Sequence, residues 1–257
     1  NSVSSIGYSA FQGCTNLESI VLPNSLTTIS NALFRACTNL QQVTIPSSVT
    51  TIKDQAFLGC DHLNRINITD MAAWCGIDHE TWAGYPISAS YSLYLNGNQV
   101  TNLTLPNGLT TINRLAFANC TSLTSVTIPS SVTSVEYSAF SGCTNLTRVN
   151  ISNMGAWCRI NFANVYANPL TLAHHLYLNG TKVTNLNNIN NETSIRDYAF
   201  SGCTDFTELT IAGSVFSIGN NAFIDCSNMT SVSIPSTVNT IGRNAFSGCT
   251  SLTRVNI

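Results

Sequence analysis

The chain repeats itself every 23 residues, and this period restricts its fold more than any other feature. One repeat, LQQVTIPSSVTTIKDQAFLGCDH, begins at Leu40, and the same pattern begins again at Leu63, Leu123 and Met229. The shared pattern is L-x-x-V-x-I-P-x-S-V-T-x-I-x-x-x-A-F-x-x-C. A fixed period of roughly 20 to 50 residues is typical of repeat architectures. One such unit offers too few apolar residues to fold alone, so we expect successive units to stack into a shared core.

Each repeat contains two alternating segments and a turn. In L-x-x-V-x-I the last two apolar residues alternate with a polar one, which is the period of a half-buried strand. Pro46, Pro129 and Pro235 end this strand because proline has no N–H to donate. The segment S-V-T-x-I alternates again and is rich in β-branched residues, so it predicts a second short strand. Ala-Phe and Cys predict a turn or a single helical turn that places Phe over Phe and Cys over Cys between coils about 4.8 Å apart.

A longer period of 83 residues is superimposed on the short one. The segment RINITDMAAWCGI (65–77) matches RVNISNMGAWCRI (148–160), and YPISASYSLYLNGNQVTNL (85–103) matches residues 168–186. We expect each match to be an insert that replaces one coil's ordinary return path, at about 69–102 and 152–185.

Both inserts contain a helix signal and a hairpin signal. Asp70 and Asn153 are good N-caps for a short helix carrying Met-x-Ala-Trp-Cys. The Asn-Gly pair that follows Leu-Tyr-Leu is typical of a two-residue hairpin turn, centred on residues 96–97 and 179–180. The coils at 186–203 and 206–226 are the least regular, since Phe206, Ala212 and Gly213 depart from the pattern.

The recurrence of Pro, Ala-Phe and Cys within this pattern strongly resembles the BspA-like (Treponema-type) leucine-rich repeats over nearly the whole chain. The resemblance implies a β-rich, right-handed leucine-rich repeat solenoid with a parallel sheet and short helical turns, a single array over residues 1–257. It further implies a place at the cell surface or in secreted proteins, with roles in adhesion and protein binding, and it brings no catalytic residues. The Met-x-Ala-Trp-Cys and Leu-Tyr-Leu-Asn-Gly segments also resemble segments that accompany such repeats in surface proteins.

The chain starts at Asn1 and ends at Arg254-Val255-Asn256-Ile257, in the same repeat phase that precedes both inserts. We therefore expect this chain to be a fragment of a longer one, with a third Met-x-Ala-Trp-Cys insert after Ile257.

Eight of the ten cysteines stand in one repeat phase, so they read as a structural position of the repeat. These are Cys14, Cys37, Cys60, Cys120, Cys143, Cys203, Cys226 and Cys249. Disulfide frameworks usually have irregular spacings, whereas reduced cysteine is among the most buried residue types. We expect buried free thiols. The alternative is a ladder of disulfides, which the distance between stacked coils would permit.

The composition excludes two classes of partner. Charged residues make up only 9% of the chain, and its ten Lys and Arg give a net charge of −2 without forming a basic stripe, so we expect no nucleic-acid binding. No continuous apolar run approaches the roughly 18 residues of a membrane span, so we expect no membrane insertion in this segment.

Few residues have the types and spacing of a metal or catalytic site. Cys75 and His79, with Asp78 and Glu80, have the residue types of a metal site, but the matching positions after Cys158 have no ligands. We therefore interpret this segment as a solvated loop. His174 and His175 are adjacent, so they would point in opposite directions on a strand and cannot chelate one ion together.

The sequence contains no glycine-rich phosphate loop, Ser-His-Asp set or paired carboxylates, so we expect no enzyme activity, no metal and no cofactor. The aromatic residues of the inserts leave a choice. Trp74 and Trp157 are either ligand-stacking platforms or, as we favour, an apolar face that closes the flank of the solenoid. Tyr94 and Tyr177 fit a core edge and an interface equally well.

The exposed row of the first strand is the candidate binding surface, because parallel strands present these side chains as one broad, regular face. By repeat register its members are Glu18, Ser19, Gln41, Gln42, Thr44, Asn64, Arg65, Asn67, Thr124, Ser125, Thr127, Arg148, Asn150 and Glu208. The sequence favours a non-enzymatic adhesion or recognition module for a protein or glycan partner. The alternatives are a structural spacer that displays other domains and, more remotely, a carbohydrate- or metal-dependent activity built on the inserts.

Overall fold

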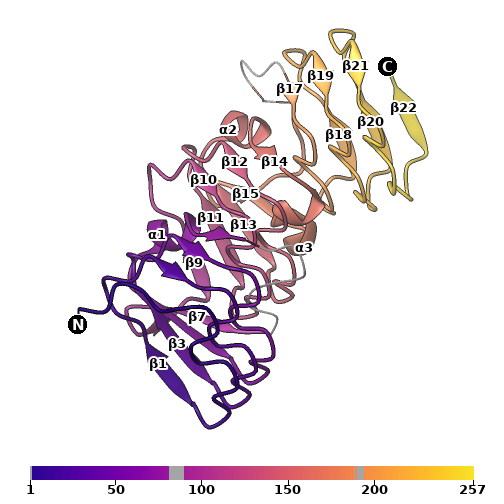
Figure 1. Ribbon diagram of the computed structural model, residues 1–257. Coiled ribbons are helices and arrows are strands. Elements are labelled where there is room, and N and C mark those ends of the chain that lie inside the picture. Colours follow the sequence, from indigo (N-terminus) through magenta and orange to yellow (C-terminus); the bar gives the residue numbers. More distant parts are fainter. Residues whose placement is uncertain (1, 81–89, 188, 190–193) are drawn as a thin grey trace. The chain divides into compact units, whose positions relative to one another are not determined.

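The computed structural model describes residues 2–80, 90–187, 189 and 194–257. The chain folds as a parallel β-solenoid of leucine-rich coils, which confirms the expected fold class (Figure 1). The described residues form two compact units, here called unit 1 (residues 1–102, 112–123 and 139–145) and unit 2 (residues 103–111, 124–138 and 146–257). The single array over residues 1–257 stays a prediction.

The described part of unit 1 includes two sheets and a helix. The larger sheet has the strand order β1 (Ser19–Val21), β3 (Gln42–Ile45), β5 (Arg65–Ile68), β7 (Ser92–Leu95) and β8 (Asn98–Gln99). The smaller sheet has the order β2 (Thr28–Ile29), β4 (Thr51–Ile52) and β6 (Asp78–His79), and helix α1 spans Met71–Cys75.

The remaining sheets and helices lie in or begin at unit 2. One sheet has the order β16 (Thr181–Lys182), β15 (Leu176–Leu178), β13 (Arg148–Ile151), β11 (Ser125–Ile128) and β9 (Asn102–Thr104), and another has β10 (Thr111–Ile112), β12 (Ser134–Val135) and β14 (Asn161–Phe162). Two further sheets are β17 (Ser194–Ile195), β19 (Ser217–Ile218), β21 (Thr240–Ile241) and β18 (Glu208–Thr210), β20 (Ser231–Ser233), β22 (Arg254–Asn256). The helices are α2 (Met154–Cys158), the 3-10 turn η1 (Val165–Ala167) and α3 (Leu170–Ala173).

The first strand of each ordinary coil pairs in parallel with its neighbour at the expected register. Val43 stands opposite Ile66, and Val126 opposite Val149, in each case 23 residues further along the chain. The burial of these strands alternates, so the Val and Ile side chains enter the core and the residues between them face outward. Strands β3 and β11 end immediately before Pro46 and Pro129, as expected.

The second strand is shorter than predicted. In the coil after Leu40 it contains only Thr51 and Ile52. The reason is a tight turn, because the amide of Val49 donates to the carbonyl oxygen of Pro46 at 3.1 Å. Val49 is buried, so the S-V part of the segment contributes to the core from a turn.

Phenylalanine and cysteine form the expected ladders within each unit. Neighbouring Phe rings stack with centroids 5.1 to 5.6 Å apart, as in Phe11, Phe34 and Phe57 of unit 1. Each buried repeat thiol of an ordinary coil donates to the carbonyl oxygen of the Phe one coil earlier, for example Cys60 to Phe34 at 3.0 Å. All ten cysteines are free, which confirms the thiol prediction. Cys14 differs from it in being exposed.

The residue before the Ala-Phe pair adopts a left-handed backbone conformation, which the sequence did not predict. The residue before Ala-Phe has a positive φ in coil after coil, including Gln55 (58°), Leu115 (61°) and Tyr198 (61°). A left-handed backbone costs roughly 1–2 kcal/mol for such residues. Backbone hydrogen bonds between coils offset this cost. The amide of Phe34 donates to the carbonyl oxygen of Ala56 at 2.8 Å, and the amide of Ala36 donates to the carbonyl oxygen of Leu58 at 2.7 Å.

The predicted helix and hairpin of each insert are confirmed, with one difference. Asp70 and Asn153 cap α1 and α2 as expected, accepting from the amides of Ala73 and Ala156. Strands β7 and β8 form an antiparallel hairpin, as do β15 and β16. However, β7 also pairs in parallel with β5, so the first arm of the hairpin extends the sheet and is not part of the coil's return path. The expected insert at 69–102 includes residues 81–89, which lie outside the described residues.

The irregular coil around Phe206 keeps the repeat register. Phe206 takes the position of the first Leu, is fully buried and packs edge-on against Phe200 and Phe223. Leu209 stands opposite Val232 in the parallel pair of β18 and β20. A larger side chain at the Leu position is therefore accommodated without a shift of the strand.

Candidate interaction surface

The predicted outward row faces solvent in both units. In unit 1 Ser19, Gln42 and Arg65 lie in register on β1, β3 and β5. In unit 2 Ser125 and Thr127 stand opposite Arg148 and Asn150 on β11 and β13. Every member of the predicted row is exposed or half-buried, whereas the residues between them are buried. The side chains of the row thus face outward, and its binding role stays a proposal.

The outward face is not one broad sheet, contrary to the sequence expectation. The return strands β8 and β16 each form the last strand of a sheet. In unit 2, Glu208 therefore lies on a separate three-stranded sheet from Arg148. The physical reason is that an antiparallel return strand occupies the edge to which the next parallel strand would bond. After β16 an isolated parallel bridge joins Leu186 to Ile211.

In unit 1 the outward face carries a cluster formed by Arg65, Asn67 and Tyr94. The guanidinium carbon of Arg65 lies 3.7 Å from the centroid of the Tyr94 ring, which is a close cation–π contact. The Nε–H of Arg65 donates to Oδ1 of Asn67 at 2.9 Å. The amide nitrogen of Asn67 in turn donates to the carbonyl oxygen of Val43 at 3.4 Å. The Arg65 side chain is therefore held by two contacts: its guanidinium plane lies against the tyrosine ring, and its Nε–H donates to the asparagine.

Unit 2 repeats the cluster with Arg148, Asn150 and Tyr177. The guanidinium of Arg148 again lies 3.7 Å from the ring centroid, and its Nε–H donates to Oδ1 of Asn150 at 2.6 Å. Lys182, on the hairpin's return strand, lies 5.9 Å from the same ring. Because the same contacts occur in both copies, the cluster is a recurring feature of the 83-residue period.

These clusters show where the two tyrosines lie. Tyr94 and Tyr177 are half-buried at the outward face and support the arginines. Sequence reasoning placed the arginines on the face but missed their pairing with the tyrosines. The available signal was that Arg, Asn and Tyr recur together at the 83-residue offset.

The two tryptophans are core residues, as favoured from the sequence. The indole Nε1–H of Trp74 donates to the carbonyl oxygen of Ala116 at 2.8 Å, and that of Trp157 donates to Ala199 at 2.9 Å. Trp74 is 2% exposed and Trp157 is 1% exposed. Neither ring offers a surface to a ligand.

His79 corrects the sequence interpretation of a solvated loop. Its side chain is buried against Trp74, and neither ring nitrogen has a hydrogen-bond partner among the described residues. Burial, with a smaller contribution from the charge of Arg114, lowers the pKa of His79 to about 4. Its counterpart in unit 2 is Phe162, which packs on Trp157. His79 therefore occupies a core aromatic position and is neutral at pH 7.

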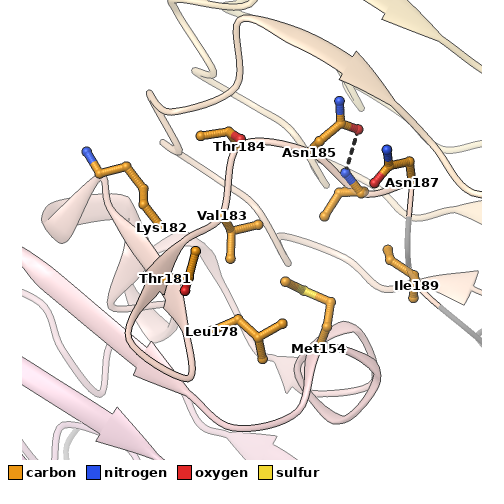
Figure 2. A pocket seen from close by; sticks show the side chains of 10 residues that line it. Met154, Leu178, Thr181, Lys182, Val183, Thr184, Asn185, Asn187 and Ile189 are labelled. Atoms are coloured by element: carbon orange, nitrogen blue, oxygen red, sulfur yellow. Dashed lines mark hydrogen bonds between the residues drawn. The ribbon is translucent and has the colours of Figure 1, made fainter.

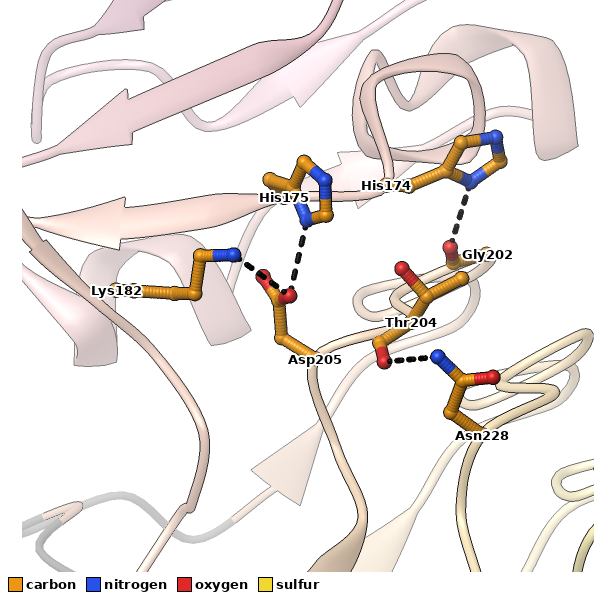
Figure 3. A network of polar contacts seen from close by, with 7 residues as sticks. All are labelled: His174, His175, Lys182, Gly202, Thr204, Asp205 and Asn228. Carbon is orange, nitrogen blue, oxygen red and sulfur yellow. Dashed lines mark hydrogen bonds and ion pairs between the residues drawn. The ribbon is translucent and has the colours of Figure 1, made fainter.

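His174 and His175 bind different partners, as expected, but for a different reason. His174 is the left-handed C-cap of α3, with its Nδ1 2.9 Å from the carbonyl oxygen of Gly202. His175 Nδ1 lies 2.9 Å from Oδ1 of Asp205, which also receives Lys182 Nζ at 3.1 Å (Figure 3). The strand begins only at Leu176, so helix termination and not strand alternation separates the two rings.

A pocket of about 230 Å³ lies beneath the hairpin of unit 2 (Figure 2). Met154, Leu178, Val183 and Ile189 form its apolar lining, and threonine, asparagine and Lys182 supply its polar atoms. Among the described residues, its lining contains no carboxylate, histidine or thiol.

Six copies of a model for the BspA type leucine rich repeat region match residues 1–75, 89–161 and 170–257. The chain belongs to the BspA-type leucine-rich repeat family. The matched ranges include both Arg–Asn–Tyr clusters, so these clusters are elaborations within BspA-type repeats. None of the curated proteins matches the chain significantly.

Solved structures similar to this BspA-type chain come from several bacteria. A leucine rich cell surface protein from Faecalibacterium prausnitzii is 24% identical, with a TM-score of 0.43, and the match covers 96% of this chain and 61% of that one. A leucine-rich repeat protein from Bacteroides ovatus is 22% identical, with a TM-score of 0.39 and coverages of 98% and 82%. The pneumococcal vaccine antigen PcpA is 16% identical, with a TM-score of 0.46 and coverages of 95% and 73%. This chain thus spans about three fifths of the length of the F. prausnitzii protein.

Two further findings concern metals and membranes. Within the described ranges, no group of three or more His, Cys, Asp and Glu side chains is arranged to hold a metal ion. In the same part of the chain, no helix combines the length and the apolar character needed to cross a bilayer.

Proposed function

We propose that this BspA-type repeat segment is a non-enzymatic recognition module of a cell-surface or secreted protein, and that its outward sheet faces bind a protein partner. The observation that carries the proposal is the pair of Arg–Asn–Tyr clusters, each built on the outward face of one unit. Arginine and tyrosine are enriched among the residues that dominate binding energies at protein interfaces. The resemblance to surface repeat proteins supports the proposed location.

The rest of the face suits a contact surface. Its Gln, Asn, Ser and Thr side chains offer hydrogen-bond donors and acceptors with little net charge. Thr44 and Thr127 are half-buried and stand opposite Asn67 and Asn150, so they border the clusters with short side chains. Such a setting lets a partner approach the arginines closely and excludes water around them.

A test selects binders without assuming a partner. A random dodecapeptide library displayed on phage is enriched on the wild-type chain, and the selected peptides are measured on blocking variants. Thr44→Trp and Thr127→Trp place a bulky side chain on the outward faces. Asp61→Trp and Thr144→Trp, at exposed turn positions, are the matched controls. We expect the selected peptides to lose binding to the face variants and to keep binding to the turn variants.

The second candidate is a spacer, favoured by the uniform Ser and Thr composition of the coils outside the clusters. A spacer predicts either no enriched peptides or peptides whose binding is indifferent to Trp at positions 44 and 127. A glycan array probed with the same variants forms a second arm. Face-dependent binding to neutral glycans, without face-dependent peptides, would contradict the proposed protein partner.

A further inference from the structure

We propose that Arg65 and Arg148 are docking points for carboxylate side chains of the partner protein, one in each unit. This inference rests on the proposed function and names the chemistry that the two faces select. The clusters fix where each guanidinium lies and leave its terminal nitrogens available.

In each arginine the Nε–H binds within the protein, and the terminal N–H groups are available to a partner. A guanidinium has five N–H donors in a rigid plane. In Arg65 the Nε–H is taken by Asn67, and the plane is held against Tyr94. The two terminal Nη groups contact no acceptor among the described residues. Arg148 is arranged in the same way. Each arginine therefore presents the edge that binds a carboxylate through two parallel hydrogen bonds.

The charge of these arginines is not neutralised within the units. Neither Arg65 nor Arg148 forms an ion pair with a described carboxylate. In unit 2, Lys182 does: its Nζ lies 3.1 Å from Oδ1 of Asp205, whose side chain is 8% exposed. We therefore assign the docking role to Arg148 and not to its neighbour Lys182.

The restraint lowers the entropy that binding would otherwise cost. An unrestrained arginine side chain loses rotamer entropy when it is immobilised. Stacking on tyrosine and the hydrogen bond to asparagine remove much of that freedom before the partner arrives. Preorganisation of this kind raises affinity without adding contacts.

Two observations favour protein carboxylates over glycans. One face of each tyrosine ring is covered by a guanidinium at 3.7 Å, so that face is closed to stacking by a sugar ring. Each cluster also offers a single unpaired cation, whereas a polyanionic sugar needs a continuous basic stripe for strong attraction. Isolated, oriented guanidinium groups are suited to isolated acidic side chains.

The test uses the whole 257-residue chain and two fluorescein-labelled dodecapeptides of alternating residues, Glu–Ser and Gln–Ser. Binding is followed by fluorescence anisotropy at low ionic strength. We expect the Glu–Ser peptide to bind and the Gln–Ser peptide to bind at least tenfold more weakly. The double variant Arg65→Ala/Arg148→Ala should weaken Glu–Ser binding at least tenfold. The matched double variant Arg35→Ala/Arg243→Ala removes the same charge from exposed turn positions and should leave binding unchanged.

A conservative variant separates geometry from charge. Arg65→Lys/Arg148→Lys keeps the charge and the fold but loses the planar fork, and we expect it to bind several-fold more weakly than wild type. Equal binding of the peptide to the Ala, Lys and turn variants would overturn the inference, as would no binding to wild type. Stronger, arginine-dependent binding of heparin than of the Glu–Ser peptide would also overturn it.

The phage selection distinguishes this inference from the proposed function. Selected peptides that need the outward face but tolerate Arg65→Ala/Arg148→Ala would leave the proposed function standing and remove the carboxylate inference. Selected peptides that bind away from the outward faces would remove both.

Discussion

The imidazole ring of His79 stands edge-on against the indole ring of Trp74, with ring centroids 6.2 Å apart and an interplanar angle of 81°. The corresponding pair of unit 2 is Phe162 on Trp157, at 5.2 Å and 59°. The two inserts thus use the same core position for a polar and an apolar ring. This difference is open to measurement.

We expect His79→Phe to stabilise unit 1. The substitution removes two buried ring nitrogens that have no hydrogen-bond partner among the described residues, and a buried unsatisfied polar group costs about 1–3 kcal/mol. The midpoint of urea unfolding at pH 7.5 should rise. The reverse change in unit 2, Phe162→His, is the matched control and should lower the midpoint. A decrease for His79→Phe would show that the histidine is satisfied in its site.

The same histidine should make stability depend on pH. Its pKa is lowered from 6.5 to about 4 in the folded chain, so between these values the unfolded chain binds more protons. Its contribution to stability is therefore complete above pH 6.5 and is lost as the pH falls toward 4. The loss amounts to about 3 kcal/mol. Urea unfolding midpoints at several pH values should show this slope in wild type and a smaller one in His79→Phe. Identical slopes would contradict the assignment.

Phe140→Ala should destabilise the chain by about 3–5 kcal/mol, as expected for a buried aromatic residue in a packed core. Phe140 is fully buried and stacks on Phe117 with centroids 5.3 Å apart. Thr127→Ala, on the outward face, should change stability by no more than about 0.5 kcal/mol. Denaturant titration of the two variants measures both values. Equal effects would mean that the inward and outward positions of the repeat are reversed.

The cysteines should divide by reactivity into one exposed and nine protected thiols. Cys14 is exposed and the others are buried, and burial raises the pKa of Cys60, Cys75 and Cys203 to about 12. Because the thiolate is the reactive form, brief iodoacetamide treatment of the folded chain should modify Cys14 alone. After denaturation without a reductant, mass spectrometry should show ten modified thiols. Fewer than ten would indicate disulfides.

Most of the fold could be predicted from the 23-residue repeat period. Val43 and Ile66 are opposite one another because they stand 23 residues apart, and no other register buries both apolar rows. The caps at Asp70 and Asn153 and the Asn-Gly hairpins are equally local signals. They were predictable because each depends on a few neighbouring residues.

Other features depend on which coil lies next to which residue, and only the tertiary structure decided them. His79 looked solvated in its charged sequence neighbourhood, yet packing of β6 against Trp74 buries it. The outward face is divided because β8 and β16 take the sheet edge that the next parallel strand would need. Arg65 and Tyr94 meet because the hairpin's first strand joins the parallel sheet one coil later. The sequence by itself determined the coil and its inward and outward positions, since these follow from local alternation. The contacts of Arg65 with Tyr94 and of His79 with Trp74 required the packing of the inserts, which lies outside the 23-residue pattern.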